Sequence, residues 1–358
     1  MSRILHMMNG LEIGGRERVV LDLIKKARRE GCDHRLLLFD SVFRNDRLDF
    51  PPGDIPICFE KRRPGFDWTL PGRVARHLER GACDALHAHN DTAVFYGALA
   101  VIHPRRAGAA LIATFHTMPA AATRAGKALT NLATRWATHL TAVSPEMGRR
   151  LAAEGWVSRQ PTIIWNGIDL EEFSLGGQTA KSLTIGHIGR FSRVKRQRDL
   201  LEAYRMLPAG NCPTELVFVG QGETLGEVQK AASGCEGVKV VPNSHEIARF
   251  LHEIDIFVIC SEHEGAPRAL LEAMACGRAI VATAVGGMPE MLTDADGTVC
   301  GRLVPPRRPD LLAQAIAELA GSVEVRRSLG AAARSRAMAF SAERQWSEYA
   351  RLYASLAD

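Results

Sequence analysis

The chain has 358 residues, of which 46% are apolar and 24% charged, a composition that is ordinary for a globular protein. This length exceeds what one hydrophobic core usually organises, so we expect two domains. No stretch approaches the roughly 20 apolar residues of a membrane span and no signal peptide is visible, which predicts a cytoplasmic protein. The eight cysteines are scattered without a C-x-x-C pair, which favours reduced core thiols over a disulfide framework or a zinc site.

The net charge of +5 is divided unevenly along the chain. Up to Gly167 there are 24 Lys and Arg against 16 Asp and Glu, a balance of +8, and the remainder has 21 against 24, a balance of −3. Solvated helix faces explain these basic residues most simply. The alternative is peripheral attraction to anionic lipids on the inner face of the membrane. The residues that would contribute include Arg105, Arg106, Arg124, Lys127, Arg149 and Arg150.

Nucleic acid is not an expected partner, because the sequence has no basic groove rich in aromatic residues and no reading motif.

The first half of the chain alternates between strand and helix patterns. Residues 4–8 are expected to form a first strand, and a loop at 9–15 follows it. Gly14 and Gly15 would let the backbone of this loop approach a ligand closely, although a simple tight turn is the other interpretation. Further strands are expected at 35–40, 54–60, 84–89, 111–116, 140–144 and 162–165. This alternation predicts a doubly wound sheet.

Three histidines lie on or at the end of these strands. His87 and His89 alternate along a strand and could face the same way. Two histidines without a nearby Cys or carboxylate make a poor zinc site, so we interpret them as lining residues without a metal. His116 ends the strand at 111–116, where this type of fold places its ligand cleft. The alternative for His116 is a histidine that is simply hydrogen-bonded at a strand end.

The second half restarts the alternation after a predicted linker at 175–182. A strand at 183–189 leads to Arg190 and Lys195, a guanidinium and an ammonium group suited to two adjacent phosphates. The alternative is a basic helix start, which is unfavourable against the helix dipole, and this cost favours a bound anion.

A stretch at 217–222 mimics a dinucleotide fingerprint. Its third glycine, Gly226, stands one position too late for the G-x-G-x-x-G spacing. No separate NAD site is therefore expected.

The most informative stretch begins with a short apolar run at 256–260, which predicts a buried strand of a parallel sheet. A loop and then a helix at 268–276 follow, with Pro267 in the first helical turn and Gly277 ending the helix in a left-handed conformation. In open α/β sheets, ligands bind beyond the carboxyl ends of the strands, and a helix start there favours phosphate.

Two glutamates flank this helix start. Because a carboxylate repels phosphate, Glu264 and Glu272 are better explained as acceptors for neutral hydroxyl groups, which sugars carry. The alternative is a surface ion pair between Glu272 and Arg268, one helical turn apart, with Glu264 as a solvated loop residue.

The run from Glu264 to Pro267, then Leu271-Glu272 with seven residues between the glutamates, and Gly286-Gly287 further on resemble the signature of the retaining glycosyltransferases of family 4. The resemblance implies an α/β protein with two Rossmann-like, doubly wound domains facing a cleft, the GT-B architecture. The expected domains are an acceptor-side domain at 1–170, on which a C-terminal helix at 341–358 packs, and a nucleotide-sugar domain at 171–340.

The same resemblance implies a metal-independent hexosyltransferase that retains anomeric configuration. It would move a sugar from a UDP- or GDP-sugar, with UDP preferred, to a saccharide or lipid-linked acceptor in polysaccharide biosynthesis, without a further cofactor. The implied roles are catalysis for Glu264 and His116, donor-phosphate binding for Gly15, Arg190 and Lys195, nucleoside binding for Glu272 and Asn243, and donor-sugar binding for Gly265, Ala266 and Arg268.

Two other activities remain open. A nucleotide-sugar 2-epimerase can share this two-domain architecture, and a non-catalytic subunit that binds sugar nucleotides would keep Arg190 and Lys195.

Overall fold

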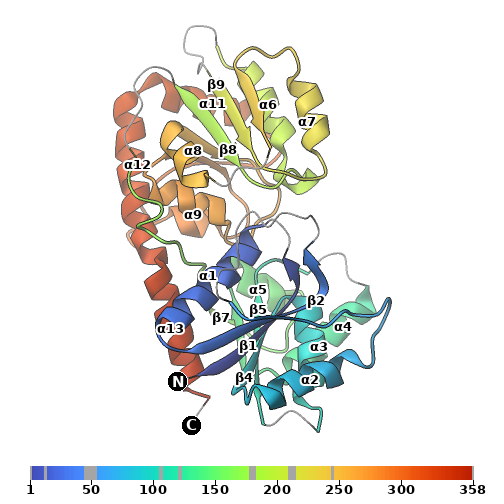
Figure 1. The fold of residues 1–358 in the computed structure, drawn as a ribbon. Coiled ribbons are helices and arrows are strands. Elements are labelled where there is room, and N and C mark those ends of the chain that lie inside the picture. The colour runs from blue at the N-terminus through green and yellow to red at the C-terminus, as the bar shows by residue number, and fades with distance from the viewer. Residues whose placement is uncertain are drawn as a thin grey trace. The chain divides into compact units, whose positions relative to one another are not determined.

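A computed structural model describes residues 2–11, 14–43, 55–104, 108–119, 123–176, 183–208, 215–242 and 246–356 of the chain. The chain divides into two compact units (Figure 1). The N-terminal unit comprises Met1–Glu12, Arg16–Asn166 and Ala342–Asp358, and the C-terminal unit comprises Ile13–Gly15 and Gly167–Ser341.

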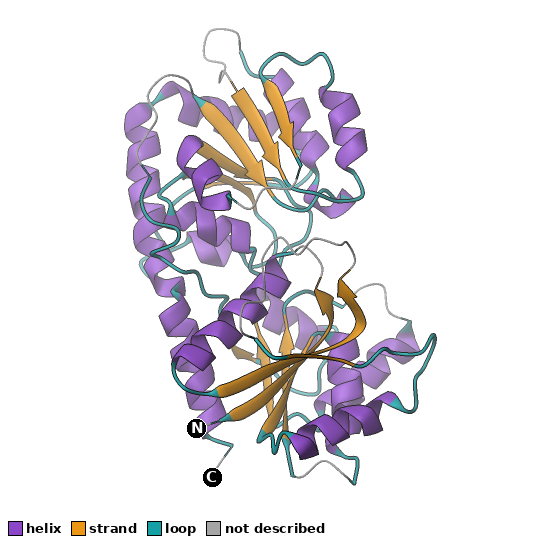
Figure 2. Ribbon diagram, viewed as in Figure 1, coloured by secondary structure: helices purple, strands orange, loops and turns teal. Residues whose placement is uncertain are grey.

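The N-terminal unit contains a parallel sheet whose described strands are β1 Arg3–Leu11, β2 Asp33–Phe43, β3 Ile57–Phe59, β4 Ala85–His89, β5 Ala110–Phe115, β6 His139–Ala142 and β7 Thr162–Ile163. Their order is β3-β2-β1-β4-β5-β6-β7, and every neighbouring pair is parallel. The helices are α1 Gly15–Arg29, α2 Leu70–Arg80, α3 Asp91–Val101, α4 Arg124–Thr134, α5 Pro145–Ala153 and α13 Ala342–Ala354. They lie on both sides of the sheet (Figure 2), which explains why all five residues of β4 are buried.

The C-terminal unit repeats this plan with strands β8 Thr184–Ile188, β9 Glu215–Val219, β10 Val238–Val241, β11 Ile256–Ile259, β12 Ala279–Thr283 and β13 Arg302–Val304. The order of this parallel sheet is β10-β9-β8-β11-β12-β13. Its helices are α6 Gln197–Arg205, α7 Leu225–Ala232, α8 Ile247–Glu253, α9 Arg268–Ala275, α10 Met288–Leu292, α11 Pro309–Gly321 and α12 Val323–Ala337, with 3-10 turns at Arg193–Lys195 and Met338–Phe340.

Helix α13 belongs to the N-terminal unit although it is the last element of the chain. Its buried side chains Tyr349, Leu352 and Tyr353 pack with β-strand residues such as Ile4 and Ile112. The hydroxyl of Tyr353 also lies 2.8 Å from Nδ1 of His87, which is fully buried. The interpretation of His87 as a lining residue is therefore wrong: its neighbours on the sheet face are the aromatic rings of α13, so it is a core residue.

The predicted alternation of strands and helices is confirmed in both units, with differences at the ends of elements. The outer strands β3 and β7 have only three and two residues, fewer than the sequence predicts. A strand at the edge of a sheet is hydrogen-bonded to only one neighbouring strand, so fewer of its residues are held in the extended conformation. Most of the predicted linker at 175–182 lies outside the described residues. Among the described helices, none combines the length and apolar character needed to cross a membrane.

Candidate functional site

Each sheet reverses its strand order at one place, between β1 and β4 in the N-terminal unit and between β8 and β11 in the C-terminal unit. In open α/β sheets, the loops that leave the carboxyl ends of the two strands at such a point diverge and leave room for a ligand. In the C-terminal unit these are the loops at 189–196, after β8, and 260–267, after β11. Five of the ten residues to which the sequence assigns a role lie on these two loops: Arg190, Lys195, Glu264, Gly265 and Ala266.

Lys195 and Glu264 meet at this point. The Nζ atom of Lys195 donates a hydrogen bond of 2.5 Å to Oε1 of Glu264, and the hydroxyl of Ser261 donates to the same oxygen at 2.6 Å. The Glu264 side chain is only 9% exposed and that of Lys195 is 24% exposed. The other carboxylate oxygen of Glu264 has no hydrogen-bond partner within the described residues. The geometry thus leaves one acceptor oxygen beside a cation.

Backbone contacts hold the two loops together. The N–H of Glu262 donates to the carbonyl of Val194 at 2.8 Å, and the thiol of Cys260 donates to the carbonyls of Lys195 and Arg196 at 3.3 and 3.2 Å. Burial raises the pKa of the Cys260 thiol to about 12, so it remains a neutral donor. These bonds fix the distance between the loop that carries Lys195 and the loop that carries Glu264.

A third loop, after β12, packs against the backbone of Glu264. Gly286 has a φ of +57°, and a Cβ at this position would overlap the carbonyl oxygen of Glu264. The N–H of Gly287 donates to the carbonyl of Gly265 at 2.9 Å. Glycine is required at 286 both for its positive φ and for this close approach.

Glu272 pairs with Arg268 on α9, as the alternative interpretation of the sequence expected. Nε of Arg268 donates to Oε1 of Glu272 at 2.8 Å. The pair is not at the surface, however, because the two side chains are 4% and 5% exposed. A buried ion pair is costly to form and costly to break, so this one holds both side chains in place at the start of α9.

Pro267 does not lie in the first turn of α9 as predicted. It precedes the helix with an extended ψ of 125° and caps it, and its carbonyl accepts the N–H of Leu270 at 3.2 Å. Gly277 does follow the helix with a left-handed φ of +67°. Gly265 and Ala266 lie in the loop before the cap, and both are buried.

Arg190 is exposed at the start of the loop after β8, and a buried chain of hydrogen bonds holds its backbone. Gln197 donates to the carbonyl of Arg190 at 2.8 Å and lies 3.3 Å from Nε2 of His187. Nδ1 of His187 donates to the carbonyl of Val258 on β11 at 2.9 Å. Sequence reasoning missed Gln197 and His187. The only available signal was a glutamine at the start of a helix directly after the basic run.

The glycines that mimic a dinucleotide fingerprint have a packing role. Gly220 and Gly222 have φ angles of +144° and +149°, and a Cβ on either would overlap a carbonyl oxygen of the neighbouring loop, that of Gly189 or Phe191. The N–H of Phe191 donates to the carbonyl of Gln221 at 2.6 Å. These glycines therefore let two strand-end loops pack closely.

Gly15 begins α1 but is grouped with the C-terminal unit, and a Cβ on it would lie 3.3 Å from Cβ of Arg268 at the start of α9. Asn243 lies outside the described residues. His116 directly follows β5 in the N-terminal unit and is 6% exposed. Its N–H donates to Oδ1 of Asn90 at 3.0 Å. Burial, with a smaller contribution from the positive charge of Arg16, lowers the pKa of His116 to about 3, so its ring is neutral at pH 7.

Three buried histidines come close enough together to suggest a metal site. The nitrogens of His6, His87 and His89 lie within 4.8 Å of one another. Both ring nitrogens of each are already hydrogen-bonded, His6 and His89 to other histidines and His87 to Tyr353 and Thr114. A metal needs a free lone pair from each imidazole. The described geometry is therefore a hydrogen-bond network.

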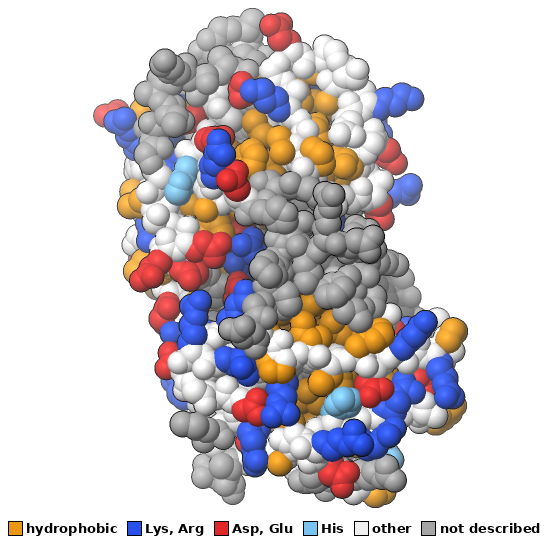
Figure 3. Space-filling model, viewed as in Figure 1, with side chains coloured by type: hydrophobic (Ala, Val, Ile, Leu, Met, Phe, Trp, Pro, Cys, Tyr) orange, Lys and Arg blue, Asp and Glu red, His pale blue; other side chains and the backbone are white. Residues whose placement is uncertain are grey.

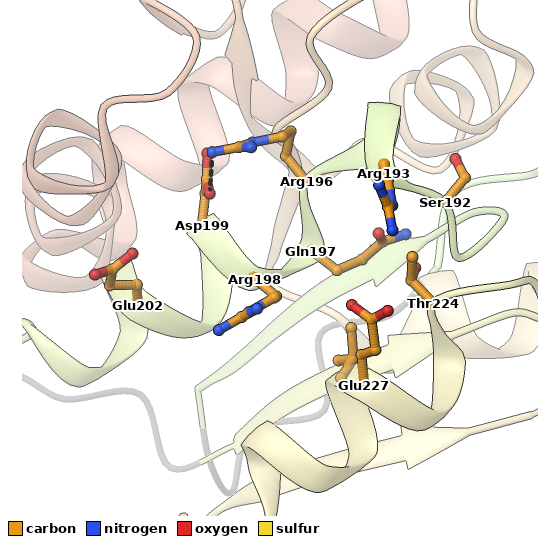
Figure 4. A pocket seen from close by; sticks show the side chains of 10 residues that line it. Ser192, Arg193, Arg196, Gln197, Arg198, Asp199, Glu202, Thr224 and Glu227 are labelled. Carbon is orange, nitrogen blue, oxygen red and sulfur yellow. Dashed lines mark hydrogen bonds and ion pairs between the residues drawn. The ribbon is translucent and has the colours of Figure 1, made fainter.

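A shallow pocket of about 500 Å³ opens beside the loop after β8 (Figure 4). Residues of α6 and α7 and of the preceding turns line it, among them Arg193, Arg198, Thr224 and Glu227. None of the predicted site residues is among those that line it. Its acidic and basic side chains are mixed, so it favours no particular ligand charge.

Comparison with known proteins gives consistent matches over both units. The family model described as Glycosyltransferase Family 4 matches residues 13–172, and the model described as Glycosyl transferases group 1 matches residues 182–322. The putative glycosyltransferase EpsF of Bacillus subtilis is 29% identical over 317 residues, which cover 77% of each chain. The GDP-mannose:cellobiosyl-diphosphopolyprenol alpha-mannosyltransferase of Xanthomonas campestris is 23% identical over 77% of each chain.

Solved structures show the same fold. The Anabaena HepE protein, solved in complex with UDP-glucose, superposes with a TM-score of 0.83 at 21% identity, covering 99% of this chain and 100% of the other. Such a likeness over the full length shows that the two doubly wound units form a GT-B fold.

We expect Gly286→Ala to destabilise the C-terminal unit by about 1–3 kcal/mol or more, because the substitution adds backbone strain and a clash with the Glu264 carbonyl. Urea unfolding measures this loss. The matched control is Gly226→Ala, which lies within α7 with no atom within 4 Å of the new Cβ and should stabilise slightly. Equal stability of the two variants would contradict the packing role of Gly286.

Proposed function

Because the chain belongs to glycosyltransferase family 4, we propose that it is a retaining hexosyltransferase of polysaccharide biosynthesis. It transfers the sugar of a nucleotide-diphosphate sugar to a saccharide or lipid-linked acceptor. A UDP-sugar is the proposed donor, which is supported by the UDP-glucose complex of HepE. A lipid-linked acceptor is supported by the Xanthomonas relative, a mannosyltransferase that acts on a cellobiosyl-diphosphopolyprenol.

The observation that carries this proposal is the contact between Lys195 and Glu264 at the point where the strand order reverses. The cation matches the diphosphate end of a nucleotide sugar, and the neighbouring carboxylate, with one acceptor oxygen left, matches the hydroxyl groups of the sugar end. In this proposal Lys195 and Arg190 bind the diphosphate, with the start of α9 and Gly15. Glu264 accepts hydrogen bonds from donor-sugar hydroxyls, beside the backbone of Gly265 and Ala266.

The nucleoside binds through Glu272 and Asn243 in the same proposal. Glu272 uses an oxygen for the ribose hydroxyls while Arg268 holds its carboxylate in place. The rigid pair gives the ribose a fixed partner, which reduces the ordering cost of binding.

In the proposed reaction, the bond between the anomeric carbon and the phosphate oxygen breaks while the acceptor oxygen bonds to that carbon on the same face. The departing phosphate oxygen takes the proton of the acceptor hydroxyl. Lys195 and Arg190 stabilise the negative charge on the leaving diphosphate, so the proposal needs no metal ion. His116, neutral because of its burial, and Glu264 position the donor sugar.

A double displacement with Glu264 as the nucleophile ranks second. Lys195 and Ser261 both donate to Oε1 of Glu264, and these bonds stabilise its charge and so weaken it as a nucleophile.

We expect Lys195→Ala to weaken donor binding by about 10- to 100-fold, because a charge-assisted hydrogen bond contributes about 1.5–3 kcal/mol. Isothermal titration with UDP and UDP-glucose measures this change. Lys239→Ala is the matched control, since Lys239 makes an equally short ion pair, with Glu215, on an outer strand of the same unit. Unchanged affinity in Lys195→Ala would contradict the phosphate assignment.

We expect Glu264→Ala to abolish transfer with a smaller loss of nucleotide affinity, because Glu264 contacts the sugar and not the phosphates. Transfer to an acceptor is followed by NMR, and UDP affinity by titration. A reaction of the unaltered protein with donor alone separates the alternatives, since an epimerase would convert the donor without acceptor. Full transfer activity in Glu264→Ala would overturn the catalytic assignment.

Peripheral binding to an anionic membrane surface from the cytoplasmic side is part of the same proposal. Trp68 is 82% exposed in the N-terminal unit, and its ring lies 4.1 Å from that of Phe66. In the same unit, Arg63, Arg73 and Arg76 line a hollow of about 450 Å³, in which Arg73 is paired with Glu60 and Asp67. Figure 3 shows further Lys and Arg side chains over the visible face of this unit. Of the basic residues that the sequence suggested, Arg105 and Arg106 lie outside the described residues, and Arg150 is paired with Glu146 and Glu154.

We expect the protein to sediment with anionic liposomes at low salt and to be released at high salt. Trp68→Ser should reduce binding, and Arg76→Ala should weaken it about fivefold, because each basic residue near the surface contributes about 1 kcal/mol. Trp136→Ser alters a partly exposed tryptophan elsewhere in the unit and should have little effect. Binding without salt dependence, or no binding, would contradict this part of the proposal.

A further inference from the structure

Four buried histidines form a continuous row of hydrogen bonds across the sheet of the N-terminal unit. His34 Nδ1 lies 2.9 Å from His6 Nε2, His6 Nδ1 lies 3.0 Å from His89 Nε2, and His89 Nδ1 lies 3.0 Å from His116 Nε2. The row follows the strand order β2-β1-β4-β5, because each histidine lies on one of these strands or at its end. It ends at the residue proposed to contact the donor sugar. We call these four residues the histidine row.

Each ring in the histidine row is neutral at pH 7. Burial lowers the pKa of His6 and His89 well below the usual value, that of His34 to about 4 and that of His116 to about 3. A neutral imidazole has one N–H donor and one acceptor nitrogen. Every ring inside the row must therefore donate to one neighbour and accept from the other.

The contacts all run in the same sense, from Nδ1 of one ring to Nε2 of the next. If His34 has its proton on Nδ1, then His6, His89 and His116 must also have theirs on Nδ1. If one ring has its proton on Nε2, all four must. Any mixture would place two donors or two lone pairs face to face, which loses at least one buried hydrogen bond. The tautomers of the four rings are thus coupled.

The two outer nitrogens of the row, His34 Nε2 and His116 Nδ1, are buried and have no hydrogen-bond partner within the described part of the chain. His34 is closed in by the rings of Trp346 and Tyr353 on α13, with ring centroids at 5.8 and 5.2 Å. The far end of the row is therefore sealed under the last helix. His116 Nδ1 is buried as well, and the side chain of Asn166 beside the ring acts to raise the pKa of His116. In the proposed function, this end of the row is the one at the donor sugar.

We propose that His34, His6 and His89 are positioning residues that set the tautomer and ring orientation of His116. The proposal rests on the role of His116 at the donor sugar. With the row intact, His116 can change its tautomer only if all four rings change together, which holds it as one group, a donor or an acceptor, toward a sugar hydroxyl. Without it, the ring can exchange tautomers and rotate, so that only part of the molecules has the productive form. This loss reduces turnover and leaves nucleotide affinity unchanged.

The first test uses the unaltered, ligand-free protein labelled with ¹⁵N-histidine. Nitrogen chemical shifts distinguish Nδ1–H, Nε2–H and doubly protonated rings. We expect the four histidines of the row to be neutral and to share one tautomer. A mixture of tautomers, or an imidazolium among the four at pH 7, would overturn the proposal. The nitrogen chemical shifts are measured without any enzymatic activity. If the unaltered protein transfers no sugar, the proposed function fails, and this result is distinct from the outcome of the tautomer measurement.

The second test breaks the row at its far end, away from the proposed sugar site. His34→Leu should change the nitrogen shifts of His116 and lower kcat about tenfold, with the KM for the donor unchanged within about twofold. His34→Asn keeps a hydrogen-bonding group near the position of Nδ1 and should restore both. If His34→Leu does not fold, the coupling is tested by the nitrogen shifts of His34→Asn and of the unaltered protein. Unchanged His116 shifts in a folded His34→Leu would overturn the coupling.

The matched control is His87→Gln. His87 is fully buried two residues from His89, but its hydrogen bonds go to Tyr353 and Thr114 and not to the row. We expect this variant to lose stability while the His116 shifts and kcat remain near those of the unaltered protein. Equal losses of kcat in His87→Gln and His34→Leu would show a general structural effect and overturn the positioning role.

Discussion

The hydrogen bond from Lys195 to Glu264 depends on three loops that leave neighbouring strands of one sheet. Lys195 comes from the loop after β8, Glu264 from the loop after β11, and Gly286, behind Glu264, from the loop after β12. The backbone hydrogen bond between Glu262 and Val194 joins the first two loops, and the glycine at 286 lets the third pack against the backbone of Glu264. A cation and a carboxylate can therefore lie in contact in a partly buried place. In the proposed function, this arrangement is already formed before the donor binds.

Both units contain buried ionic groups as well as buried neutral polar groups. In the C-terminal unit, ionic groups approach each other in pairs, Lys195 with Glu264 and Arg268 with Glu272. In the N-terminal unit, the buried carboxylates of Glu17 and Asp67 pair with Arg16 and Arg73. Neutral imidazoles and hydroxyls also lie in its sheet, and α13 covers them with Tyr349 and Tyr353. Neutral groups avoid the desolvation cost of charge, so many of them can be packed in one core as long as each has a partner. Helix α13, the last helix of the chain, thus packs in the core of the N-terminal unit.

Sequence reasoning was most successful where a signal is local. The apolar run before Glu264, the left-handed glycine at 277 and the alternation of strands and helices all follow from short-range patterns, and the described elements confirm them. It was less successful where partners come from distant segments. Pro267 proved to be a cap because its ψ depends on the loop that precedes it, and His87 proved to be a core residue because α13, more than 250 positions later, covers it.

By itself the sequence determined the two-part α/β plan, the family, and the identity of the candidate residues on the strand-end loops, because periodicity and motif spacing are properties of neighbouring residues. Only the tertiary structure decided that Lys195 meets Glu264 and that the Arg268–Glu272 pair, which the sequence offered as one interpretation, is buried. It also decided that four histidines on or directly after four separate strands form a row. Hydrogen bonds between segments far apart in the chain depend on sheet order and on distances of a few tenths of an ångström, and a linear pattern contains neither.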